Sequence, residues 1–141
     1  MNNSLDLKIR QIAADVFGNL GSGHSEAVYQ RAMEVGLRLQ HLRFEAQRVI
    51  EVRYKEHYVG EEYLDLLVKS DSTDECLIVE LKAAQDVSLP EEQQLRNYLV
   101  SLKIDKGLLI NCPQPSRNKK PQKARKAEPE FRSVSRESIS Y

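Results

Sequence analysis

The apolar residues of this chain change their period near residue 44, and this change constrains the fold more than any other feature. Before it, apolar side chains recur at helical spacing in two segments, about 4–18 and 25–41, separated by a glycine-rich turn. After it, residues 49–54 alternate between two sides, which is typical of a strand with one better-buried face. The sequence therefore predicts two amphipathic helices followed by the start of a β-sheet.

The remainder of the chain predicts a mixed sheet. Residues 58–69 and 76–83 have strand character and complete a three-stranded meander. Residues 90–103 return to helical spacing, with Pro90 in the first turn. The short apolar run 107–112 follows this helix, so it fits a buried strand that joins the sheet through a crossover. A weaker strand signal at 131–134 suits a sheet edge, and the expected fold class is α/β.

The size and composition of the chain indicate one globular domain. Its 141 residues are 40% hydrophobic and 30% charged, which suits a single core. No apolar run approaches the roughly 20 residues that cross a bilayer, and the N-terminal segment lacks an apolar stretch with a cleavage site. We therefore expect an intracellular protein that is not secreted and contacts no membrane. Cys76 and Cys112 lie in apolar runs away from other ligands, so we expect reduced thiols.

Charge is distributed unevenly along the chain. Residues 1–116 carry 13 basic and 18 acidic side chains, whereas residues 117–141 carry 8 and 3. This division predicts a domain over 1–116 and a basic C-terminal tail over 117–141. The density of basic residues in the tail suits contact with a polyanion through Lys119, Lys120 and Lys123, although a solvated tail has the same composition.

Charged residues interrupt two of the expected strands. Side-chain alternation places Asp65 on the face of its strand opposite Leu64, Leu66 and Val68. In the next strand, Glu80 and Lys82 share a face and lie about 6.6 Å apart along the chain. Such charges are costly inside a sheet unless they are paired or bind a metal.

Two chemical interpretations fit this pattern. If the strands are neighbours, Asp65 and Glu80 converge on Mg²⁺ or Mn²⁺, and Lys82 lies beside the attacking water, which is the arrangement for phosphodiester hydrolysis. Alternatively, Glu80 and Lys82 form a salt bridge at a strand end and Asp65 hydrogen-bonds a turn.

Two helix motifs add polar candidates. Glu26 and Tyr29 are three residues apart and share a helix face, so an acid there can reach the metal site. Gln94 and Tyr98 are four residues apart on the later helix and can contact phosphate or order the lysine. Each also has an ordinary interpretation: a first-turn acid, two core tyrosines and a surface amide.

Together these residues resemble the GxxExxY protein family, a branch of the PD-(D/E)XK nuclease-like superfamily. The resemblance covers about residues 5–112 and rests on five ordered motifs, which are Gly23-His-Ser-Glu26-Ala-Val-Tyr29, Gly60-Glu-Glu-Tyr-Leu-Asp65-Leu-Leu-Val68, Ile78-Val-Glu80-Leu-Lys82-Ala83, Gln94-Leu-Arg-Asn-Tyr98-Leu99 and Gly107-Leu-Leu-Ile-Asn111. It implies a restriction-endonuclease-like αβββαβ core, with a central mixed sheet flanked by helices. It further implies metal binding by Asp65 and Glu80, catalysis by Lys82, and an additional acid at Glu26 for both roles. Gln94, Tyr98 and Tyr29 are then expected to bind substrate.

The expected function is a Mg²⁺- or Mn²⁺-dependent nuclease acting on DNA, and the resemblance also implies a homodimer. One departure supports an alternative, because relatives tend to carry a basic residue in the segment before Asp65 where this chain has Glu-Glu-Tyr-Leu. The alternative is a catalytically inactive nuclease-fold module that binds nucleic acid or protein. A structural subunit, assembled through the sheet edge or the first helix, is a third interpretation.

Overall fold

The computed structural model describes residues 4–85, 89–115 and 128–136. Its elements, in chain order, are α1 (Leu5–Leu20), α2 (Glu26–Leu39), β1 (Arg43–Tyr54), β2 (His57–Lys69), β3 (Cys76–Lys82), α3 (Leu89–Leu102), β4 (Lys106–Asn111) and β5 (Glu130–Ser135). The run from α2 to β4 reproduces the predicted αβββαβ core, and the α/β fold class is confirmed.

The strands form one mixed sheet in the order β1-β2-β3-β4-β5. The first three strands are an antiparallel meander, as the sequence predicts. β4 lies parallel to β3, and α3 makes the crossover between them. β5 pairs antiparallel with β4 over Glu130–Ser135, so these residues, which the sequence places in the basic tail, are part of the sheet. Lys119, Lys120 and Lys123 lie outside the described residues.

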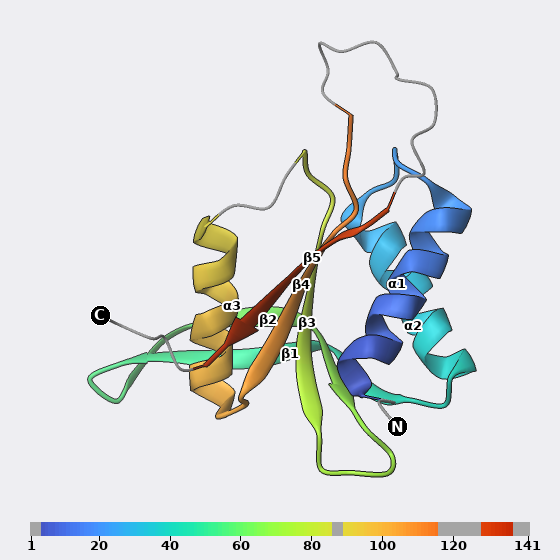
Figure 1. Ribbon diagram of the computed structural model, residues 1–141. Coiled ribbons are helices and arrows are strands. Elements are labelled where there is room, and N and C mark those ends of the chain that lie inside the picture. Colours follow the sequence, from blue (N-terminus) through green and yellow to red (C-terminus); the bar gives the residue numbers. More distant parts are fainter. Residues whose placement is uncertain (1–3, 86–88, 116–127, 137–141) are drawn as a thin grey trace.

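Helices cover both faces of the sheet: α1 and α2 lie side by side on one face, and α3 lies on the other (Figure 1). Serine side chains cap the N-termini of the first two helices. Ser4 Oγ accepts a hydrogen bond from the Leu7 N–H, and Ser25 Oγ accepts one from the Val28 N–H. Each face has its own apolar cluster. No helix among the described residues is long and apolar enough to span a membrane. Cys112 is buried and Cys76 half-buried, and burial raises the pKa of both thiols.

The predicted alternation of faces along β2 is wrong at one position. Leu66 and Val68 pack in the cluster under α1 and α2, but Leu64, two residues earlier, packs in the cluster under α3. The cause lies in β1, where Gln47 adopts a φ of 53° opposite Asp65. Ala46 pairs with Leu66 and Arg48 with Leu64, while Gln47 and Asp65 are skipped in the register. The outer half of the hairpin therefore turns over and runs past α3 (Figure 1).

The packing of α1 against α2 gives a stability prediction. A Cβ built on Gly36 would lie 2.5 Å from Cγ2 of Ile12, a β-branched side chain that cannot move away easily. Gly36→Ala should therefore destabilise the protein by about 1 to 3 kcal/mol, even though alanine favours helix by about 1 kcal/mol. Gly18→Ala is the matched control, because nothing lies within 4 Å of its added Cβ. Chemical denaturation of both variants measures the difference, and equal stabilisation by the two would contradict the packing.

Candidate active site

The centre of the site is the point where β2 and β3 diverge. Their ladder ends at the pair Leu66 and Val79, so Asp65 and Glu80 are the next residues on the two strands. The Asp65 N–H donates to Glu80 Oε1 at 2.9 Å, and the Leu81 N–H donates to Asp65 Oδ2 at 2.8 Å. Backbone groups that lose their ladder partners are thus satisfied by carboxylates. This exchange brings the two acids together.

Burial makes this pair of acids electrostatically costly. Glu80 is 4% exposed and Asp65 is half-buried. Desolvation, and next the charge of Asp65, raise the pKa of Glu80 to about 8, while the charge of Lys82 opposes this shift. Without a cation, the pair therefore holds a proton at neutral pH.

The donor set suits a hard divalent cation. Mg²⁺ commonly binds one or two protein carboxylates and completes its shell with water and phosphate oxygens. Asp65 and Glu80 supply two carboxylates in contact, and a cation between them would offset their mutual repulsion. No group of three His, Cys, Asp or Glu side chains in the described part of the chain is arranged to hold a metal ion. The fit thus rests on the two acids.

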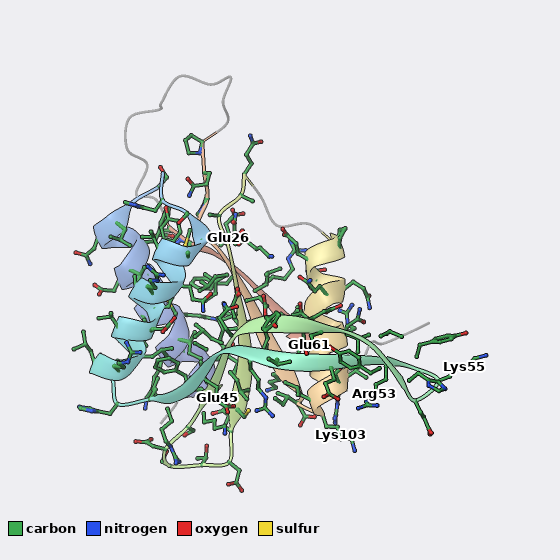
Figure 2. All side chains as sticks on the ribbon, turned by 180° about the vertical axis from the view of Figure 1, so that it is seen from behind. Glu26, Glu45, Arg53, Lys55, Glu61 and Lys103 are labelled. Atoms are coloured by element: carbon green, nitrogen blue, oxygen red, sulfur yellow. The ribbon has the colours of Figure 1, made fainter. Side chains whose placement is uncertain are left out.

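Lys82 and Glu26 lie at the end of β3. Lys82 is half-buried, and its backbone pairs with Asn111 of β4. Glu26 is exposed at the first turn of α2, as Figure 2 shows, and its Oε1 accepts from the Ala83 N–H at 3.4 Å. The predicted helix-borne acid therefore reaches the strand end beside the lysine, but the structure does not group it with Asp65 and Glu80.

Tyr29 has a structural position rather than an accessible one. Its side chain is fully buried, and its hydroxyl donates to the Gly21 carbonyl at 2.6 Å. The same oxygen accepts from the Gln114 side chain at 3.2 Å. The sequence predicts that Tyr29 contacts substrate, but the buried side chain has no exposed surface for such a contact. Tyr29 instead ties the turn before α2 to the segment after β4.

On the opposite face, α3 carries Gln94 and Tyr98. Gln94 is exposed, and Tyr98 is 3% exposed within the apolar cluster under α3. Burial, followed by the charges of Glu80 and Glu62, raises the pKa of the Tyr98 phenol. Its hydroxyl is within hydrogen-bonding reach of the exposed Glu62 carboxylate. No pattern in the sequence links Glu62 to Tyr98, because the two residues meet only in the folded chain.

Gln30 and Gln47, which no sequence motif marked, contact the backbone carbonyl and the carboxylate of Asp65. Gln47 Nε2 donates to Gln30 Oε1 at 2.9 Å and lies 3.5 Å from Asp65 Oδ1. Gln30 Nε2 donates to the Asp65 carbonyl at 3.2 Å. Side chains from α2 and β1 thereby fix both ends of Asp65. No local pattern marks these residues, because their roles depend on the conformation of Gln47.

A mixed sheet with two convergent acids and a lysine at one strand end defines the class of restriction-endonuclease-like folds. A family model described as PD-(D/E)XK nuclease superfamily matches residues 3–124. Because this match spans most of the chain, the chain belongs to the PD-(D/E)XK nuclease superfamily. A comparison with curated protein sequences finds no match.

Two solved structures align with this chain, and one of them has a TM-score above 0.5. The crystal structure of SSO0001 aligns with a TM-score of 0.53 and 17% identity, over 77% of this chain and 50% of that one. This chain therefore spans half the length of that protein, and the likeness supports the fold. A phage-related exonuclease from Haemophilus somnus 129PT aligns with a TM-score of 0.48 and 12% identity, over 97% of this chain and 74% of that one.

The raised pKa of Glu80 predicts a pH dependence of stability in EDTA. Because the pKa in the folded state is about 8 and the usual value is 4.5, the folded state binds the proton more tightly. Its stabilising effect is complete below pH 4.5 and is lost as the pH rises through 8, a change on the order of 5 kcal/mol. The melting temperature should fall by several degrees between pH 5.5 and 8.5, and Glu80→Gln should flatten this dependence. Identical slopes in both proteins would contradict it.

The contacts of Gln47 predict a separate effect on metal affinity. Gln47→Gly keeps the left-handed backbone without strain and removes the amide, so it separates the two roles of this residue. We expect the protein to stay folded and its affinity for Mn²⁺ to drop about tenfold, as is typical when a group supporting a metal ligand is lost. Gln47→Asn, which retains an amide and tolerates this conformation, is the comparison. Calorimetric titration measures the Mn²⁺ affinity of both variants. Unchanged affinity in Gln47→Gly would show that the Gln47 amide does not support Asp65 as a metal ligand.

Proposed function

We propose that this chain is a divalent-metal-dependent nuclease that hydrolyses phosphodiester bonds, with DNA as its substrate. The observation that carries the proposal is the contact between Asp65 and Glu80 at the point where β2 and β3 diverge, with Lys82 two residues further along β3. Membership of the nuclease superfamily supports the same chemistry. The five sequence motifs carry our assignment to its GxxExxY branch.

Each polar group has a distinct role in this proposal. Asp65 and Glu80 hold Mg²⁺ or Mn²⁺, and Gln30 and Gln47 keep Asp65 in position. When bound, the cation acts as a Lewis acid and lowers the pKa of bound water. The Lys82 ammonium orients the attacking water and stabilises negative charge that develops on the phosphate. Glu26 is a candidate for an additional catalytic and metal-binding acid, and the exposed Gln94 is a candidate substrate contact. Tyr98 is 3% exposed and, like Tyr29, has little surface for such a contact.

The choice of DNA rests on charge and location. The basic run at 117–126 carries six positive charges and no acid, so it suits a polyanionic backbone through Lys119, Lys120 and Lys123. We place the protein inside the cell, where such a substrate is present. Glu61 and Glu62 are exposed on β2 and repel phosphate groups. We therefore expect the nucleic-acid backbone to reach the acid pair from a direction other than along β2.

Cleavage of a defined substrate panel tests the proposal. Labelled linear duplex, single-stranded, flap and four-way DNA, with RNA for comparison, are incubated with Mg²⁺, Mn²⁺ or EDTA. We expect metal-dependent cleavage that Glu80→Ala and Asp65→Asn abolish. Lys82→Ala should lower the rate at least a hundredfold and leave Mn²⁺ affinity close to that of the wild type, since the lysine acts on the water and phosphate.

A matched control excludes contamination and misfolding. Lys69→Ala removes a lysine from the other end of the β2–β3 pair and should leave the rate unchanged. If the folded wild-type protein binds DNA equally well in EDTA and cuts no member of the panel, the nuclease proposal fails. That result would favour the alternative of a nuclease-fold module that only binds nucleic acid.

A further inference from the structure

We propose that the outer half of the β1–β2 hairpin binds an extended segment of a partner protein that is rich in lysine or arginine. This half comprises residues 48–64, beyond the point where β2 leaves β3. Ile50 and Leu64 attach it to the cluster under α3, and both side chains are buried. The partner binds the other side, which is called the outer hairpin face below. This binding does not depend on the nuclease chemistry.

Three cross-strand pairs make up the outer hairpin face. Side chains alternate along a strand, so the neighbours of Ile50 and Leu64 point away from α3. The pairs are Val49 with Tyr63, Glu51 with Glu61 and Arg53 with Tyr58. All six of these residues are exposed. Figure 2 shows Glu61 where the hairpin crosses in front of α3, and Arg53 nearer the tip of the hairpin.

Large apolar side chains gather on this face. Val49, Tyr58 and Tyr63 are 45%, 53% and 53% exposed. Val49 and Tyr63 are directly opposite each other on the two strands, so they form one continuous apolar area. A two-stranded ribbon is only marginally stable in water without further packing, and grouped apolar surface is typical of interaction sites. The outer hairpin face therefore has the character of a docking surface.

One carboxylate organises the two tyrosines. The Tyr58 hydroxyl donates to Glu61 Oε1 at 2.9 Å, and the Tyr63 hydroxyl donates to Glu61 Oε2 at 3.0 Å. Both phenols thus converge on Glu61, and the hydrogen bonds to this carboxylate raise the pKa of both hydroxyls. A carboxylate and aromatic rings are the two kinds of group that attract an ammonium or a guanidinium. The chemistry of this cluster therefore suits a cationic side chain.

The negative charge of the face is only partly balanced within the chain. Glu51 and Glu61 are direct cross-strand neighbours, and like charges in such a pair repel each other. Arg53 forms an ion pair with Glu51, with 2.8 Å between the charged atoms. Glu61 takes part in no ion pair among the described residues. A cation supplied by a partner beside Glu61 would relieve this repulsion.

The tip of the hairpin already contains a contact of this chemical kind. Lys55 Nζ lies 5.4 Å from the centre of the Tyr54 ring. Tyr54 follows Arg53 in the strand and therefore points to the opposite side, away from the outer hairpin face. In the described part of the chain, no cation lies over the rings of Tyr58 and Tyr63. These two rings are thus available to a cation from a partner.

Charge and spacing favour an extended basic segment over nucleic acid. Glu51 and Glu61, with the exposed Glu62 beside them, repel phosphate groups. Neighbouring side chains on one face of a strand are about 6.6 Å apart, and so are alternate side chains of an extended peptide. A segment with a basic residue at every second position can therefore contact the face repeatedly, while its backbone lies along the hairpin.

A labelled peptide of alternating arginine and serine tests the proposal, with its binding followed by fluorescence anisotropy in EDTA. We expect saturable binding that a peptide of alternating glutamate and serine does not show. Glu61→Gln keeps an acceptor for the phenols and removes the charge, so it should weaken binding about fivefold. The double variant Y58A/Y63A should weaken it about tenfold, because both aromatic rings are lost.

Two matched controls separate this face from general surface charge. Tyr54→Ala removes an exposed tyrosine on the opposite side of the hairpin, and Asp71→Asn removes an exposed acid in the turn before β3. Both should bind the basic peptide as the wild type does, and circular dichroism checks that every variant is folded. No binding by the folded wild type, or equal weakening by Asp71→Asn and Glu61→Gln, would overturn the proposal. Binding of oligothymidylate that Y58A/Y63A weakens would overturn it in favour of base stacking on this face.

Discussion

The contact between Asp65 and Glu80 is the interaction on which the rest of the site depends. Where β2 leaves β3, backbone N–H groups lose their ladder partners, and the two carboxylates accept from the Asp65 and Leu81 N–H groups instead. The fold thereby satisfies its backbone with side chains that repel each other. The pKa of Glu80, raised to about 8, reflects this cost, and a divalent cation is the ligand that would remove it.

The divergence of the strands has its own cause in β1. Gln47 adopts a left-handed backbone opposite Asp65, and the hairpin turns over at this pair. Its inner half contributes Leu66 to the cluster under α1 and α2, and its outer half contributes Leu64 to the cluster under α3. The kink therefore serves both packing and chemistry, since it opens the sheet at the acids and supplies an amide that supports one of them.

Much of the architecture could be predicted from the sequence because hydrophobic period reports local structure. The meander, the crossover through α3 and the strand near residue 131 all follow from such patterns. The pattern D...ExK, with its apolar surroundings, also identified Asp65, Glu80 and Lys82 as neighbours. The sequence does not decide whether Tyr29 contacts substrate or packs in the core. A helical spacing of three from Glu26 does not reveal that Glu26 is exposed and Tyr29 buried.

The sequence by itself determined which segments are helices and strands, which residues are charged inside apolar strands, and the family to which they point. Only the tertiary structure decided which face each β2 side chain occupies, that Gln30 and Gln47 hold Asp65, and that Glu26 lies with Ala83 apart from the acid pair. The physical reason is range. Hydrophobic period depends on neighbours a few residues away, whereas a single backbone conformation at Gln47 reverses the faces of strands that meet only in the folded chain.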